Sequence, residues 1–177
     1  LVTRVLCFEI GQEEASWTVD LGQRQVYSMT HDKSGGLVIV CDDGIDRYVD
    51  GELTRSIPFT QSVRLFSARE SGEVLVAFET AERSNRMTRA LLLGDGLEML
   101  WSGQFEGVPR ALDCQDGTGC LLMSDRLEQI RWHHDEITTR TVPHDGARDV
   151  VVNDDGEAIL IYSDRAEKLR TEHEETQ

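Results

Sequence analysis

The stretch 28–43, SMTHDKSGGLVIVCDD, carries the pattern that decides the fold of this chain. A short segment with apolar residues leads into a polar turn that contains a glycine, and an aliphatic run ending in aspartate follows. The pattern returns without a gap in RALDCQDGTGCLLMSD (110–125) and in DVVVNDDGEAILIYSD (149–164). A fourth stretch, LFSARESGEVLVAFET (65–80), fits the same frame with weaker turn chemistry. The chain is therefore built from an internal repeat.

Each repeat begins with a predicted β-hairpin. A glycine stands at the same place in all the copies, and glycine adopts the positive φ that a tight turn between twisted strands requires. The aliphatic runs after the glycines, such as LVIV (37–40), are too short for buried helices. They are rich in β-branched and aliphatic residues, so they predict strands covered on both faces. The glycines are Gly35, Gly72, Gly117 and Gly156.

The length of the repeat indicates the architecture. The glycines lie 37, 45 and 39 residues apart. Two further strand-like pieces follow each hairpin, as GIDRYVDG (44–51) and ELTRSIPF (52–59) follow the first. A period of about 40 residues with four short strands is typical of a β-propeller blade. We therefore predict an all-β fold, a β-propeller of about four four-stranded antiparallel blades, either a closed ring or part of a larger propeller.

The predicted domain is a propeller over residues 1–170, followed by an acidic tail at 171–177. The segment 2–21 aligns with 87–105, so the chain opens midway through a repeat. SDRAEKLRT (163–171) aligns with SDRLEQIRW (124–132) and is predicted to form a third strand. The first residue is leucine rather than methionine, so we expect the natural start to be absent and the chain to be a fragment of a larger propeller. The predicted units are a half blade (1–23), three blades (24–62, 63–109 and 110–147) and a partial blade (148–170).

The stretch GGLVIVCDDGIDRYVDGEL (35–53) resembles blades of a broad propeller group. That group includes the periplasmic propellers of two-component sensors, NHL-type repeats and WD repeats. The resemblance covers nearly the whole chain at the level of blade shape and implies the propeller fold. The Trp-Asp dipeptide and the Gly-His pair of true WD repeats are absent, so the chain is not placed in that family.

The chain is strongly acidic, with 33 Asp and Glu against 18 Lys and Arg and a formal net charge of −15. Acidic residues spread along the whole chain create a field that repels phosphate backbones and anionic lipid surfaces. We therefore predict no nucleic-acid and no membrane binding. No apolar run reaches the length of a membrane span and no signal peptide is visible, so we expect a cytoplasmic protein.

The stretch IRWHHDE, Ile130–Glu136, has two adjacent histidines followed by two acids. Adjacent residues of a strand point to opposite faces, so His133 and His134 are poorly placed to chelate one ion. The aligned stretches RYVDGE (47–52) and LRTEHEE (169–175) indicate an ordinary acidic turn here. The glycine turns also lack the aspartate that opens a calcium-binding loop. We predict no metal and no other cofactor.

The cysteines show no CxxC spacing, so they do not indicate a zinc cluster. Cys114 and Cys120 flank the turn QDGTG (115–119) and leave two alternatives open. They form either a disulfide across the hairpin or two free thiols in a reducing compartment.

Candidate binding residues lie in two places. The insertion ETAERSNRMTR (79–89) makes the second blade longer than the others. Longer loops on a rigid scaffold often bind ligands, so Arg83, Asn85 and Arg86 are predicted contacts. Trp132 is a predicted contact as part of a stacking surface, although its position within a third strand favours blade packing.

The predicted function is that of a non-enzymatic propeller scaffold in a complex. It would bind a protein or peptide partner, or the remainder of the same polypeptide. No GxSxG nucleophile elbow and no phosphate-binding glycine loop is found in the sequence, and no catalytic residue is predicted. The alternative is a metal-dependent hydrolase of the lactonase type. That alternative requires acids, Asn or His that converge at the starts of the first strands, and the segments there converge poorly.

Overall fold

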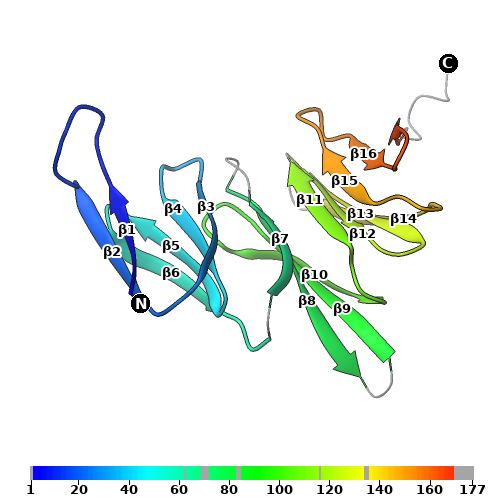
Figure 1. Cartoon of the computed structure of the whole chain (residues 1–177), viewed down its shortest axis with the longest axis horizontal. Helices are drawn as coiled ribbons and strands as arrows, with labels where there is room; N and C mark the ends of the chain where they lie inside the picture. Colours follow the sequence, from blue (N-terminus) through cyan, green and yellow to red (C-terminus); the bar gives the residue numbers. More distant parts are fainter. Residues whose placement is uncertain are drawn as a thin grey trace.

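Strands alternate with turns along the whole part of the chain that the computed structural model describes: residues 2–61, 63–68, 72–82, 85–115, 117–133 and 136–169. Within these residues there is no helix long and apolar enough to cross a membrane. The strands form five sheets that follow one another in chain order. Figure 1 shows the sheets side by side along an open arc.

All pairings between neighbouring strands in these sheets are antiparallel. The first sheet consists of β1 (Thr3–Cys7) and β2 (Trp17–Gly22). The second consists of β3 (Val26–His31), β4 (Leu37–Cys41), β5 (Gly44–Val49) and β6 (Glu52–Pro58). The third consists of β7 (Val63–Ala68), β8 (Val74–Glu82), β9 (Asn85–Leu93) and β10 (Met99–Glu106). The fourth consists of β11 (Ala111–Gln115), β12 (Thr118–Leu122), β13 (Arg126–His133) and β14 (Glu136–Pro143). The fifth consists of β15 (Asp149–Val152), β16 (Ala158–Ile161) and β17 (Ala166–Lys168). The predicted all-β fold with four-stranded antiparallel blades is confirmed.

The turn chemistry matches the sequence pattern. Gly35 and Gly117 have φ values of 84° and 80°, the conformation that favours glycine over residues with a Cβ. In the last hairpin, the Asn153 side-chain oxygen accepts hydrogen bonds from the backbone N–H groups of Asp155 (3.1 Å) and Glu157 (2.8 Å). The carbonyl side chain thus closes the turn locally, as Asx turns do.

The hydrophobic cores lie between neighbouring sheets. Every residue of β4 and of β12 is buried, because one face of each strand packs on the preceding sheet and the other face on the following sheet. Val38 and Val40 of β4 pack against Val74 and Val76 of β8, for example. Side chains at alternate strand positions point to opposite faces, which explains this division.

The insertion at 79–89 differs from the predicted loop. It continues the β8–β9 ladder, in which Thr80 pairs with Met87 and Ala81 with Arg86. The longer blade therefore carries an extended hairpin, which protrudes beyond the neighbouring strands in Figure 1. Strand formation satisfies the backbone groups of the insertion within the sheet, whereas the sequence pattern favoured an irregular loop. The predicted acidic tail at 171–177 lies outside the described residues.

The four cysteines are free thiols. Cys114 packs in the core between the third and fourth sheets, and Cys120 packs in the core between the fourth and fifth. The two side chains therefore lie on opposite faces of one sheet, which rules out a disulfide across the hairpin. Burial raises the pKa of Cys41 and Cys114 to about 11 and that of Cys120 to about 12.

We expect one cysteine, the half-buried Cys7, to react quickly with a thiol reagent in the native protein, and four to react after unfolding in urea. The buried thiols are shielded, and their raised pKa leaves almost no thiolate at about pH 8. Titration with a chromogenic disulfide reagent measures both numbers. Fast reaction of Cys120 in the native state would show that the fourth and fifth sheets separate in solution.

Candidate functional site

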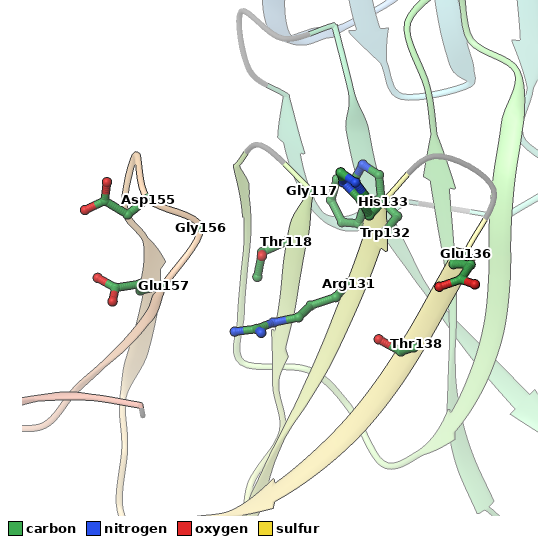
Figure 2. Close-up of a pocket in the computed structure, with 10 residues that line it drawn as sticks. All are labelled: Gly117, Thr118, Arg131, Trp132, His133, Glu136, Thr138, Asp155, Gly156 and Glu157. Atoms are coloured by element: carbon green, nitrogen blue, oxygen red, sulfur yellow. The ribbon is translucent and has the colours of Figure 1, made fainter. Parts of the chain in front are cut away.

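A cavity of about 410 Å³ lies between the fourth sheet and the β15–β16 hairpin, at the end where the turns gather (Figure 2). Its volume is within the range of known ligand pockets. Polar residues line it on both walls. The lining residues are Gly117, Thr118, Arg131, Trp132, His133, Glu136, Thr138, Asp155, Gly156 and Glu157.

One wall of the cavity carries a row of three polar residues on adjacent strands. Thr118 of β12 pairs with Arg131 of β13, and Arg131 pairs with Thr138 of β14. Residues directly opposite each other in antiparallel strands have Cβ atoms about 5 Å apart on the same face. The Cβ atom of Arg131 therefore lies between those of the two threonines, and its guanidinium extends past Thr118 in Figure 2.

Arg131 is half-buried, and Figure 2 shows its side chain extending toward the β15–β16 hairpin. Its Nε atom is buried and has no hydrogen-bond partner among the described residues. A buried N–H of this kind is unusual, because buried polar groups are nearly always hydrogen-bonded. Arg131 therefore has a donor with unused bonding capacity.

The opposite wall carries acidic residues that do not form an ion pair with Arg131. The Glu157 carboxylate lies 2.5 Å from Lys168 Nζ and accepts a hydrogen bond of 2.9 Å from Asn153 Nδ2. Lys168 and then Asn153 hold the pKa of Glu157 below its usual range. In Figure 2 the carboxylates of Asp155 and Glu157 both point away from Arg131. The Glu157 charge is thus already paired on its own sheet.

Trp132, a predicted binding residue, borders the cavity but is only 9% exposed. Its ring lies against Gly119 and shares a core cluster with Leu75 of the third sheet. Its Nε1 donates a 2.9 Å hydrogen bond to Glu73 Oε1. The backbone N–H of Trp132 donates to the Gly117 carbonyl (2.9 Å), which joins the turn to β13. The ring thus ties two sheets together beneath the cavity.

The other predicted contacts lie elsewhere. Asn85 begins β9, and Arg86 follows it on the extended β8–β9 hairpin. Arg86 is exposed, and its Nε lies 3.6 Å from Glu79 Oε1. Arg86 is not among the residues that line the cavity, and Arg83 lies outside the described residues.

The stretch IRWHHDE borders the same cavity. His133 ends β13 and pairs with Glu136 at the start of β14, and both line the cavity. His134 and Asp135 lie outside the described residues. Among the residues that are described, no group of three or more His, Cys, Asp or Glu is placed to hold a metal ion.

Arg131 was missed in the sequence, although the repeat contained a signal for it. The aligned position is Val49 in the second sheet and Arg170 in the last repeat, so some but not all of the repeats have arginine there. A cation on a half-buried strand of one blade, where another blade has valine, indicates a local role. The β15–β16 wall could not be found from sequence, because it comes from the next repeat.

Comparison with known proteins shows the fold. No protein-family profile matches the chain, and no curated protein matches it. The WD40 domain of Toxoplasma gondii coronin is 9% identical, with a TM-score of 0.62 over 93% of this chain and 49% of that one. The Dos1 propeller is 9% identical, with a TM-score of 0.51 over 83% and 45% of the two chains. A protein of unknown function from Bacteroides caccae is 17% identical, with a TM-score of 0.51 over 90% and 62%.

These solved structures include β-propellers, and the chain has the fold of part of a β-propeller. The chain spans about half the length of the coronin and Dos1 propellers that it matches. At such low identities the likeness concerns the fold alone.

Proposed function

We propose that this chain is a non-enzymatic part of a β-propeller that binds a protein or peptide partner at the cavity beside Arg131. The observation that carries the proposal is an arginine that lines a recess and whose Nε has no hydrogen-bond partner among the described residues. A fixed donor next to an open cavity suits recognition, because little side-chain ordering is needed on binding.

The state of the buried acids supports a scaffold rather than an enzyme. Asp46 accepts hydrogen bonds from Tyr48 Oη (3.1 Å) and Ser56 Oγ (2.6 Å) within its own sheet. Glu128 accepts from Arg126 Nε (2.6 Å) and Thr141 Oγ1 (2.7 Å) in the same manner. Acid–base catalysis needs a carboxylate that faces substrate, whereas both of these are used in holding strands together.

The exposed face of the last sheet supports a role within a larger propeller or complex. Ile159 and Ile161 of β16 are half-exposed. The aligned residues of the three full sheets are all fully buried against the next sheet, and they are Val38 and Val40, Leu75 and Ala77, Cys120 and Leu122. Covering the two isoleucines would bury apolar surface at about 25 cal/mol per Å². A further sheet from the same polypeptide or from a partner fits this face.

Site-specific photo-crosslinking tests the partner proposal. Benzoylphenylalanine placed at Thr138, which is exposed and lines the cavity, is expected to crosslink a discrete protein partner in cells. The matched control is the same substitution at Thr139, the next residue of β14, which is also exposed. Its side chain points to the opposite face of the strand.

A band that forms from position 138 and not from position 139 supports partner binding at the cavity. Absence of any crosslink from position 138, or equal bands from both positions, overturns it. Purified protein with a stoichiometric metal and hydrolytic activity would favour the enzyme alternative instead.

A further inference from the structure

We infer that Arg131, flanked by Thr118 and Thr138, binds a carboxylate group of the partner peptide. The inference rests on the proposed function and assigns a chemical class to the group that enters the cavity. The carboxylate belongs to an acidic side chain or to a chain terminus, since both carry the same group.

The donor geometry fits a carboxylate. An arginine guanidinium presents five N–H donors in a planar fork that matches the two oxygens of a carboxylate. The Thr118–Arg131 pairing places the Thr118 side chain on the neighbouring strand, and Figure 2 shows the fork extending past it. A carboxylate in the cavity would accept charge-assisted hydrogen bonds from the terminal N–H groups of the guanidinium, which extends toward the facing hairpin.

The protein itself does not supply this acceptor from the facing wall. Glu157 is engaged by Lys168 and Asn153 on its own sheet, and Asp155 points away from Arg131 in Figure 2. The aligned residue is Val49 in the second sheet and Arg170 in the last repeat, so arginine recurs at this place but the second blade folds without it. An external acceptor can therefore reach Arg131 without displacing the Glu157 ion pair.

The charge around the cavity favours a singly charged group. Glu136 and Asp155 are exposed acids on its rim, and the chain carries a net charge of −15. A phosphate group with nearly two charges meets stronger repulsion than a carboxylate with one. The same rim acids would attract basic residues that flank the carboxylate in a peptide.

Nuclear magnetic resonance titration of the ¹⁵N-labelled chain tests this inference. The probes are N-acetyl-glutamate amide, which has only a side-chain carboxylate, and N-acetyl-diglycine, which has only a terminal one. N-acetyl-glutamine amide is the neutral control of the same shape, and N-acetyl-lysine amide is the cationic control. The Arg131 Nε–H and Thr118 amide signals report binding.

We expect saturable shifts of both signals with one or both carboxylate probes and none with the two controls. Arg131→Gln should weaken the binding about tenfold or more, because it removes a charge-assisted pair. Arg110→Gln removes the same charge at an exposed position and should leave the affinity unchanged. Comparing the two acid probes identifies whether the side chain or the terminus is preferred.

Equal binding by Arg131→Gln, stronger binding of the lysine or glutamine probe, or no binding of either acid probe overturns the inference. The proposed function is judged separately by the crosslink from position 138. A crosslink with no carboxylate binding means that a partner docks at the cavity through other groups. If neither a crosslink from position 138 nor binding of a carboxylate probe is observed, the cavity is not a binding site.

Discussion

Replacing Asp113 with alanine is expected to lower the free energy of unfolding by about 3 kcal/mol or more. The Asp113 side chain is buried in β11 and links three consecutive sheets. One carboxylate oxygen accepts a 2.9 Å hydrogen bond from Ser67 Oγ of β7, and the other accepts a 2.9 Å hydrogen bond from the backbone N–H of Val152 in β15. Alanine leaves both donors buried without this acceptor, and each charge-assisted bond contributes about 1.5–3 kcal/mol.

Urea unfolding followed by tryptophan fluorescence measures this change. Asp145→Ala removes the same charge at an exposed position and should change stability by no more than about 0.5 kcal/mol. Asp113→Asn keeps one carbonyl acceptor and should fall between the two. If Asp113→Ala unfolds at the same urea concentration as Asp145→Ala, the carboxylate does not hold the sheets together.

The hairpins of this protein were predictable because their causes are local. The turn glycine, the Asx residue before it and the aliphatic run after it lie within about ten residues, and each has a direct physical reason. Gly35 and Asn153 behave as their turns predict. The same local pattern occurs in several repeats, so even the weaker second copy could be assigned to the same unit.

The groups that join the sheets were not predictable, because their partners come from other repeats. Asp113 was part of a turn pattern in the sequence, yet Ser67 and Val152 lie 46 and 39 residues away from it. Arg131 likewise gains its surroundings from a hairpin in the following repeat. A single sequence shows which strand positions are buried, whereas the pairing of polar groups between sheets needs the relative placement of the sheets.

The extended hairpin was also not predicted, but for a different reason. The insertion 79–89 contains charged and polar residues at most positions, a composition that is typical of a loop. In the structure β8 continues into it as far as Glu82, and β9 begins within it at Asn85. An existing ladder lowers the cost of adding further residue pairs, so context overrode the weak strand propensity of these residues.

Replacing Asp32 with alanine is expected to lower the free energy of unfolding of the protein by about 3 kcal/mol at neutral pH. The Asp32 side chain is fully buried at the β3–β4 turn. It accepts hydrogen bonds from the backbone N–H groups of Ser34 (3.0 Å) and Gly36 (2.7 Å), and Arg47 Nε of β5 donates to its other oxygen. Alanine removes all of these bonds and leaves the half-buried Arg47 without its ion-pair partner.

The effect of Asp32 should depend on pH with a definite sign. Burial alone would raise the pKa of Asp32, but the hydrogen bonds from Arg47, Ser34 and Gly36 outweigh it and hold the pKa below its usual range. The unfolded chain has an aspartate pKa of about 3.9. The stabilisation by Asp32 is therefore fully present above that value and is lost as the pH falls through the lower pKa of the folded state.

Urea unfolding of the wild type and of Asp32→Asn at about pH 7, 5 and 3 tests this dependence. Asparagine resembles the protonated acid, so the stability difference should be largest at the two higher pH values and shrink at the lowest. Asp145→Asn, at an exposed position, should show no such trend. A difference that stays constant down to pH 3 would mean that Asp32 acts through its shape rather than its charge.

The last sheet repeats this arrangement in a more open form. Lys168 of β17 aligns with Arg47 of β5, and its Nζ lies 2.5 Å from Glu157 after the turn. Here the cation side chain is 58% exposed, against 15% for Arg47. Water and salt screen the exposed pair, so Glu157→Gln should cost much less than Asp32→Asn. The same third-strand cation thus stabilises the turn strongly only where neighbouring sheets bury it.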